Sequence, residues 1–266
     1  GEILIATLEE ENSQNIFPVE LPLNIVYEDE DILVVNKDAG VPIHPSQGHF
    51  DHTLANAVAW YYQSKGQTLV YRAINRLDRD TTGLLVIAKH LLAGCILSDQ
   101  MLNRQIHRPY RAIVCGKTEK EGIIDAPIGR AEDSTVLRRI DFEHGETART
   151  RYRLLSYDEE KDLSYISLKL DTGRTHQIRV HMKYIGHPLP GDFLYNPDFR
   201  YIRRQALHSV RLSFPHPFTG DVLIFSAPLP EDMTCLFPGQ ELPSFSHPET
   251  APALPTASLS PWDNDF

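Results

Sequence analysis

The stretch at residues 75–89, NRLDRDTTGLLVIAK, joins a charged turn to a run that looks like a buried strand. Its second half, residues 83–89, is a short apolar run of the kind that forms a strand covered on both faces. Its first half presents Asp78 between two arginines at the mouth of that strand. A carboxylate in this position is a candidate reaction centre. The simpler alternative is a salt-bridged turn in which Asp78 or Asp80 caps backbone amides.

Strand patterns dominate the rest of the chain. Runs rich in apolar and β-branched residues predict further strands at residues 31–37, 110–115, 150–155, 163–170, 207–214 and 222–225. Helical patterns interrupt them at residues 53–66, about 90–104 and 175–186. Many strands at hairpin-like spacing, with few crossover helices, predict an α+β fold built on a mixed, largely antiparallel sheet.

The charge of the chain is uneven along its length. The net charge of -10 argues at first against a nucleic-acid partner. Residues 1–24 hold five acids and residues 239–266 hold four, and neither segment contains Lys or Arg. The interior therefore carries 26 bases against 27 acids, and 18 of the bases are arginine. A nearly neutral body of this kind presents a basic cleft if its arginines cluster there.

The two ends differ from the interior. Residues 239–266 are rich in Pro, Ser and Ala without periodicity, which predicts a disordered tail. Residues 1–21 combine one strand-like run with an acidic linker. No apolar run approaches the roughly 20 residues that span a bilayer, so we expect a cytoplasmic protein without membrane contact. The three cysteines, Cys95, Cys115 and Cys235, form no CxxC pair, and we expect reduced core thiols.

Residues 172–186, TGRTHQIRVHMKYIG, combine a basic face with an apolar one. At about 3.6 residues per turn, His176 and Arg179 share the basic face, and Ile178 lies on the apolar face. We expect Thr175 to cap this helix. The basic face is either a solvated stripe, or it allows Arg179 to pair with an active-site carboxylate and hold it ionised and oriented.

Two further segments contain candidate site residues. In residues 106–114, IHRPYRAIV, Tyr110 begins a strand directly after a proline. A strand tyrosine is usually a core residue, but at the edge of a cleft its ring could stack under a flipped base and its hydroxyl could relay a proton. In residues 35–46, VNKDAGVPIHPS, Lys37 and His44 either line a cleft or belong to a turn.

Five ordered motifs resemble the RluA-type family of RNA pseudouridine synthases. They are KDAGVPIHPS, NRLDRDTTGLLVIAK, RPYRAIV, GRTHQIRVHMKYIGHPLPGD and ALHSVRLSFPHPFTG, within roughly residues 22–232. The chain departs from the family in two places: Asn75 stands where a histidine is usual, and Asp38 follows Lys37 where a proline is usual. The resemblance implies a catalytic domain of the pseudouridine synthase type over residues 22–238.

The resemblance also implies a catalytic set. Asp78 is the essential group and acts on the ribose as base or nucleophile, and the sequence leaves those two mechanisms open. Arg179 is implied as the ion-pair partner of Asp78. Tyr110 is implied as the stacking residue and as a candidate acceptor for the C5 proton.

A second set is expected to bind the substrate. Ile178 is implied as an apolar wall of the uracil pocket, and Arg76 as the side chain that fills the space left by a flipped nucleotide. The expected substrate-binding residues are Arg76, Ile178, His176, Lys37 and His44.

The implied reaction converts uridine to pseudouridine. It breaks the N1–C1′ bond, turns the base, joins C5 to C1′ and removes the C5 proton, without gain or loss of atoms. We therefore expect no cofactor and no metal, and the chain has no Gly-rich nucleotide fingerprint. The expected partner is structured RNA, ribosomal RNA of the large subunit first and transfer RNA second. Such enzymes often have a preceding RNA-binding domain, and residues 1–21 look like the end of one. We expect a monomer.

Two other functional classes remain as alternatives. The first is a noncatalytic RNA-binding or ribosome-assembly factor with the same fold, against which the presence of Asp78, Tyr110 and Arg179 argues. The second is a nucleoside hydrolase-like enzyme acting on free small molecules. The arginine-rich interior and the lack of a second well-placed carboxylate argue against that class.

Overall fold

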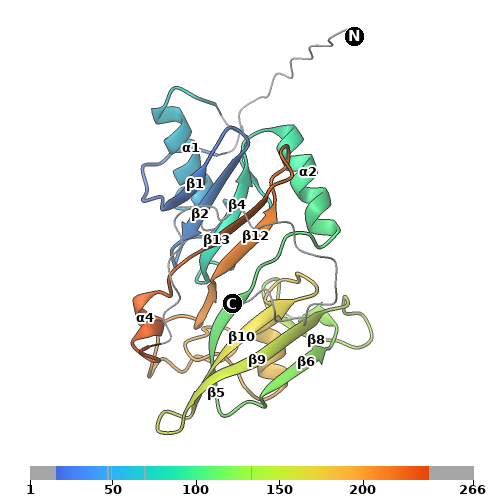
Figure 1. Cartoon of the computed structure of the whole chain (residues 1–266). Coiled ribbons are helices and arrows are strands. Elements are labelled where there is room, and N and C mark those ends of the chain that lie inside the picture. Colours follow the sequence, from blue (N-terminus) through green and yellow to red (C-terminus); the bar gives the residue numbers. More distant parts are fainter. Residues whose placement is uncertain (1–15, 47, 49, 69, 133, 240–266) are drawn as a thin grey trace.

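The computed structural model describes residues 16–46, 48, 50–68, 70–132 and 134–239. Figure 1 shows the main sheet, which has nine strands in the order β1-β2-β4-β11-β5-β10-β9-β6, with β3 on β4. Their bounds are Ile25–Glu28 (β1), Ile32–Lys37 (β2), Arg72–Ala73 (β3), Thr82–Ala88 (β4), Tyr110–Cys115 (β5), Glu121–Asp125 (β6), Arg149–Asp158 (β9), Leu163–Leu170 (β10) and Leu207–Ser209 (β11).

Antiparallel pairing prevails in this sheet, and β4 with β11 is the one parallel pair among the described strands. A Cβ added to Gly83 in β4 would lie 2.2 Å from the Ser209 carbonyl oxygen, and Gly83 has a φ of +113°. Only glycine lets the two backbones approach this closely. The expected mixed, largely antiparallel α+β fold is confirmed.

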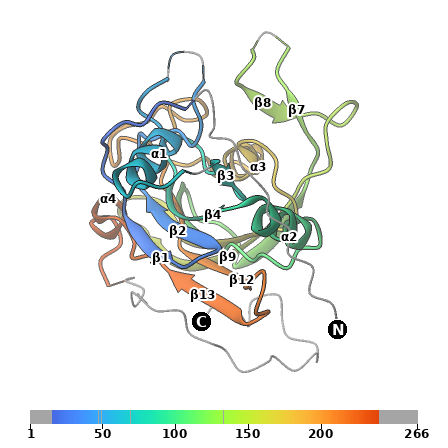
Figure 2. The same cartoon turned by 90° about the horizontal axis from the view of Figure 1, so that it is seen from above.

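Two small sheets and four helices complete the described fold. The sheets are β7 (Ile128–Arg130) with β8 (Arg138–Ile140), and β12 (Arg211–Pro215) with β13 (Val222–Ser226). The helices are α1 (Leu54–Ser64), α2 (Leu91–Leu102), α3 (Gln177–Tyr184) and α4 (Glu231–Thr234). In Figure 2 the β7–β8 hairpin projects beyond α3, whereas β12–β13 lies on the other side of the main sheet. None of the helices in these described residues is long and apolar enough to cross a membrane.

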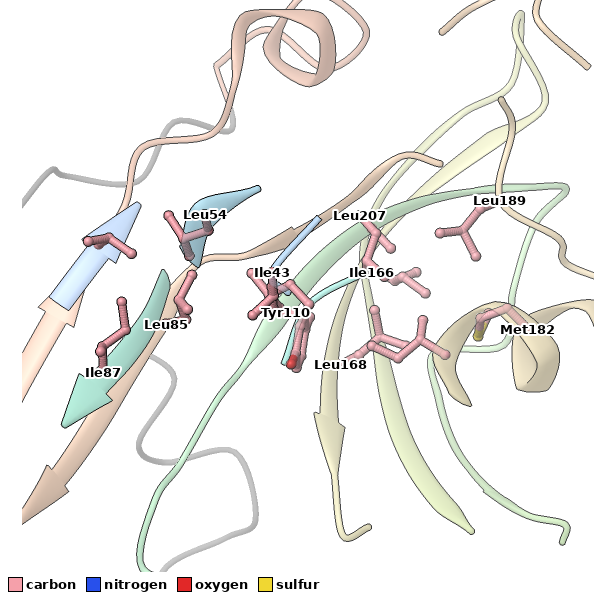
Figure 3. Close-up of a cluster of buried hydrophobic side chains, with 14 of the residues drawn as sticks. Ile43, Leu54, Leu85, Ile87, Tyr110, Ile166, Leu168, Met182, Leu189 and Leu207 are labelled. Atoms are coloured by element: carbon pink, nitrogen blue, oxygen red, sulfur yellow. The ribbon is translucent and has the colours of Figure 1, made fainter. Parts of the chain in front are cut away.

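The central strands of the main sheet are buried on both faces, and their successive residues point to opposite sides. Leu33 and Val35 of β2 belong to a core cluster with side chains of α1 and α3. Ile32 and Val34 belong to another, with side chains of α2, β12 and β13. Figure 3 shows part of the first cluster, with Tyr110 between side chains from β4 and β10. The continuous apolar runs of the sequence therefore form strands covered on both sides.

Two local predictions are wrong. The expected strand at residues 207–214 breaks at Val210, so β11 lies in the main sheet and β12 pairs with β13 in a separate one. Thr175 does not cap α3: the N-cap is His176, with a φ of +58° and no capping bond from its side chain. Instead Gln177 accepts from the Arg174 backbone N–H at 2.9 Å and fixes the start of the helix.

Further predictions concern the two ends of the chain and the cysteines. Residues 1–15 of the expected N-terminal segment and residues 240–266 of the expected tail lie outside the described residues. The Phe17 carbonyl accepts from Asn56 of α1 at 2.7 Å, so the segment before β1 lies against that helix. The cysteines are free, as expected, but they are not core residues, because Cys95 and Cys235 are exposed and Cys115 is half-buried.

Candidate active site

The loop that carries Asp78, between β3 and β4, is anchored on two sides. The Lys37 ammonium group, at the end of β2, donates to two backbone carbonyls, one of them that of Arg79 at 2.8 Å. Asn75, which stands where the family usually has histidine, accepts from the Val86 backbone N–H at 2.9 Å. These bonds tie the loop to the sheet, so the backbone around the carboxylate is held in one place.

Asp78 reaches across to α3. Its Oδ2 accepts from the Arg179 guanidinium at 2.9 Å, between residues 101 positions apart in sequence. The expected ion pair is therefore present. Arg179 is only 4% exposed, so it does not belong to a solvated stripe. The salt-bridged turn also exists, but it is formed by the neighbouring Arg79 and Asp80 at 2.9 Å.

Arg179 also binds a second carboxylate, Asp192, which lies in the loop after α3 and is fully buried. The guanidinium donates to both Asp192 oxygens at 2.7 Å and keeps its third nitrogen for Asp78. Burial would lower the pKa of Arg179, but Asp192 and Asp78 outweigh it and raise that pKa. Asp192 thus holds the planar guanidinium of Arg179 in place, and the guanidinium in turn orients Asp78.

Sequence reasoning missed Asp192. It lies within the motif GRTHQIRVHMKYIGHPLPGD, but it is one acid among many, and nothing in the linear pattern pairs it with Arg179. The available signal was the Pro-Gly turn directly before it, because a turn after a helix brings its next residues back toward that helix. Gly191 allows this return, since an added Cβ would lie 2.3 Å from the Arg204 carbonyl oxygen.

Tyr110 and Ile178 lie together in the cleft beside Asp78. Both are 4% exposed, and both line the cleft with Leu207. Tyr110 is thus a core residue and a cleft residue at once, since its ring packs in the core cluster seen in Figure 3. Burial raises the pKa of the Tyr110 hydroxyl, so that hydroxyl is neutral at physiological pH. The arrangement offers an apolar wall for a planar base next to the carboxylate.

The cleft has a volume of about 570 Å³. It contains the predicted residues Asp78, Arg76, Tyr110, His176, Ile178 and Arg179. Basic side chains line its outer parts, namely Arg104, Arg108, Lys169 and Arg174, with Asp171 as a further acid. The arginines of the nearly neutral interior therefore do gather at one site, where they favour a polyanion such as a nucleic-acid strand.

His176 lies next to the carboxylate. Its Nε2 is 4.0 Å from Asp78 Oδ1, and its Nδ1 is 2.9 Å from the hydroxyl oxygen of Tyr195. Burial lowers the pKa of His176, and the attraction of Asp78 opposes this. A neutral imidazole therefore stands beside the catalytic candidate and faces the cleft.

Two expected substrate-binding residues do not line the cleft. Lys37 is 2% exposed, and its ammonium group is bonded to the Asp78 loop at the Arg79 carbonyl. Burial lowers the pKa of Lys37 to about 7, against the attraction of Asp80 and Asp78. His44 is exposed and packs edge-on against Tyr71, with ring centroids 5.1 Å apart.

Within the described part of the chain, one group of side chains has a metal-like arrangement: Asp29, Asp31 and His216. His216 Nδ1 accepts backbone N–H groups of Phe218 and Thr219, so its proton lies on Nε2 and points at the carboxylates. A protonated nitrogen cannot ligate a metal, and the group fits a hydrogen-bonded cluster. It also lies outside the cleft that contains Asp78.

The cleft combines a carboxylate oriented by an arginine, an apolar wall and several basic side chains, an arrangement suited to a base within a nucleic-acid strand. A family model described as RNA pseudouridylate synthase matches residues 31–184, more than half of the chain. The chain belongs to this family, and it is an isomerase that converts uridine to pseudouridine in RNA.

Individual relatives are described as pseudouridine synthases as well. The uncharacterized RNA pseudouridine synthase YjbO of Bacillus subtilis (strain 168) is 43% identical over 242 residues, which cover 90% of this chain and 84% of that protein. The ribosomal large subunit pseudouridine synthase D of Vibrio cholerae is 41% identical over 247 residues, covering 88% and 75%. The solved structure titled Human RNA Pseudouridylate Synthase Domain Containing 1 matches with a TM-score of 0.66 and 27% identity, over 83% of this chain and 86% of that one.

Proposed function

We propose that the protein isomerises specific uridines in structured RNA, that the substrate is large-subunit ribosomal RNA, and that Asp78 is the catalytic group. The observation that carries this is the position of Asp78, held by buried Arg179 next to Tyr110 at the inner part of a basic cleft. The catalytic unit is residues 22–238, and it acts as a monomer. A ribosomal substrate places it in the cytoplasm.

The geometry divides the work among three side chains. Arg179 holds Asp78 in place and directs it into the cleft, where the carboxylate acts on the ribose of the bound uridine. Tyr110 and Ile178 form the apolar wall on which the uracil ring stacks while it turns. Tyr110 is also the side chain that we assign to the final proton transfer from C5. Its hydroxyl is neutral, so it acts as a relay: it accepts the C5 proton while its own proton passes to solvent water.

A flipped nucleotide suits this cleft better than a free nucleoside. Extruding a base from a helix costs on the order of a few kcal/mol, which stacking and an inserted side chain offset. Arg76 is exposed, precedes Asp78 by two positions and lines the cleft, so it is placed to fill the vacated space. The basic outer residues then hold the phosphates of the flanking nucleotides.

The choice of large-subunit ribosomal RNA rests on relatives. Several at about 40% identity over most of the chain have the name ribosomal large subunit pseudouridine synthase D. The test is release of tritium from C5-tritiated transcripts of large-subunit ribosomal RNA and of transfer RNA. Release from the ribosomal transcript alone supports the proposal. Release from transfer RNA alone moves the substrate to that class, and release from neither contradicts the proposed substrate.

A further inference from the structure

One hydroxyl joins the active site to the β7–β8 hairpin. Tyr195 lies in the loop after Asp192, and its own backbone N–H donates to Asp192 at 3.1 Å. Its ring covers the Arg179 guanidinium, with 4.9 Å from the ring centroid to Cζ. Its hydroxyl oxygen accepts from the backbone N–H of Arg138, the first residue of β8, at 2.9 Å. Figure 2 shows this hairpin extending beyond α3.

The same hydroxyl lies within hydrogen-bond distance of one ring nitrogen of His176. A backbone N–H only donates, so the Tyr195 oxygen accepts from Arg138, and its own O–H is available to donate to His176 Nδ1, 2.9 Å away. In the neutral imidazole the proton then lies on Nε2. Nε2 is the nitrogen that faces Asp78 Oδ1, at 4.0 Å. This distance is too long for a hydrogen bond to Asp78 itself.

The backbone of His176 has an uncommon conformation. Its φ is +58°, in the left-handed region that non-glycine residues rarely occupy. Such strained positions persist when neighbouring contacts hold them, and they gather at functional sites. His176 lines the cleft, whereas Tyr195 is buried behind it and is not among the lining residues. Tyr195 therefore acts on the cleft through His176.

We propose that Tyr195 is a positioning residue that makes His176 a hydrogen-bond donor toward an oxygen of the bound uridine beside Asp78 and fastens this donor to the β7–β8 hairpin. The inference rests on the proposed function for the identity of the bound nucleotide. The link from Arg138 through Tyr195 to His176 stands on geometry alone. A movement of the hairpin against RNA would therefore change the position of the His176 N–H that faces the substrate.

The test compares Tyr195→Phe with Tyr157→Phe. The first keeps the ring over Arg179 and removes one hydroxyl. The control removes one exposed hydroxyl, bonded to Asp162 at 2.8 Å, outside the cleft. Long-range ¹H–¹⁵N spectra of histidine-labelled protein, assigned with His176→Gln, report the tautomer without RNA. We expect the Nε2–H form in the wild type and in Tyr157→Phe, and a mixture in Tyr195→Phe. The Arg138 amide should exchange faster only in Tyr195→Phe.

Activity gives the second readout. At saturating RNA, the single-turnover rate of tritium release should fall about threefold to tenfold in Tyr195→Phe, as expected for one lost hydrogen bond. The KM for RNA, measured separately at steady state, should change little. In a His176→Gln background the same substitution should have no further effect, because the two residues act as one unit.

Two results would overturn the inference. One is a wild-type His176 with its proton on Nδ1, which needs no variant to fold and no RNA. The other is an equal loss of rate from Tyr195→Phe with and without His176. A wild type that releases no tritium contradicts the proposed function instead, and the tautomer still decides whether Tyr195 positions His176.

Discussion

At the scale of single residues, the site depends on one guanidinium shared by two carboxylates. Asp192 takes two nitrogens of Arg179 and Asp78 takes the third, so the fork links α3, the loop after it and the loop before β4. A lysine ammonium is a point charge and cannot span both carboxylates in this planar way. The geometry of Arg179, and not only its charge, is therefore needed.

Arg179→Lys tests this requirement. We expect kcat to fall on the order of 100-fold, because Asp78 loses its fixed orientation while the local charge is kept. The matched control is Arg200→Lys, since Arg200 makes a similar fork to Asp198 but is exposed. Steady-state tritium release measures both. Equal activity of Arg179→Lys and the wild type would contradict the role of the fork.

Tyr110→Phe separates stacking from proton transfer. The ring stays between the side chains of β4 and β10, and only the neutral hydroxyl is lost. We expect the affinity for RNA to be unchanged and the single-turnover release of tritium to slow about tenfold or more, the lower range for general acid–base catalysis. Filter binding and tritium release measure the two effects. Release at the wild-type rate would rule out proton relay through this hydroxyl.

At the scale of elements, Glu28 joins β1 to α1. Its carboxylate accepts from the hydroxyls of Tyr61 at 2.5 Å and Tyr62 at 2.9 Å, and from the Lys89 ammonium at 3.0 Å. Burial would raise the pKa of Glu28, but these bonds and one from Lys65 outweigh it and lower that pKa to about 2. The folded state thus binds the Glu28 proton more weakly than the unfolded state does.

Glu28→Gln should therefore have a pH-dependent effect on stability. Because the folded pKa is depressed, the contribution of Glu28 is fully present above the unfolded value of 4.5 and is lost as the pH falls toward 2. We expect the variant to be about 2 kcal/mol less stable at pH 7 and the difference to shrink below pH 4.5. Urea unfolding at several pH values measures it, with exposed Glu143→Gln as control. A pH-independent difference would contradict the account.

The sequence predicted the elements with strong local patterns and missed what depends on tertiary contacts. The helix at residues 53–66 was predictable because its apolar residues recur at helical spacing and the pattern stops at a glycine, and the structure adds a local capping box of Thr53 and Asn56. The break at Val210 was not, because its N–H binds the Pro109 carbonyl and its carbonyl binds Ala227, both distant in sequence. In the same way, Asp78 and Arg179 were found from motifs, whereas Asp192 and Tyr195 gain their roles only when α3 and its following loop fold back.

At the scale of the whole molecule, the cleft is lined by basic side chains although the net charge of the chain is -10. The acids concentrated at residues 1–24 and 239–266 account for most of the excess, while Arg76, Arg104 and Arg174 line the cleft. RNA binding should then depend on these local charges and weaken as salt rises.

Arg104→Gln tests the outer part of the cleft. Arg104 is exposed and lines the cleft, and the Asp78 carboxylate is bonded to Arg179 and not to it, so we expect a higher KM for RNA with kcat unchanged. The slope of log affinity against log salt should decrease by about 0.7, the value for one phosphate contact on a single strand. Arg203→Gln, exposed and not among the cleft-lining residues, is the control. An unchanged slope would place the RNA elsewhere.

The most direct measurement of the central claim is single-turnover tritium release by Asp78→Asn, compared with the wild type and with Asp80→Asn. Asparagine keeps the shape of Asp78 but removes its charge, and Asp80, which pairs with Arg79, controls for the loss of a carboxylate in the same loop. We expect no release from Asp78→Asn, unchanged RNA binding, and nearly wild-type release from Asp80→Asn. Release by Asp78→Asn at the wild-type rate would contradict the assignment of Asp78 as the catalytic group.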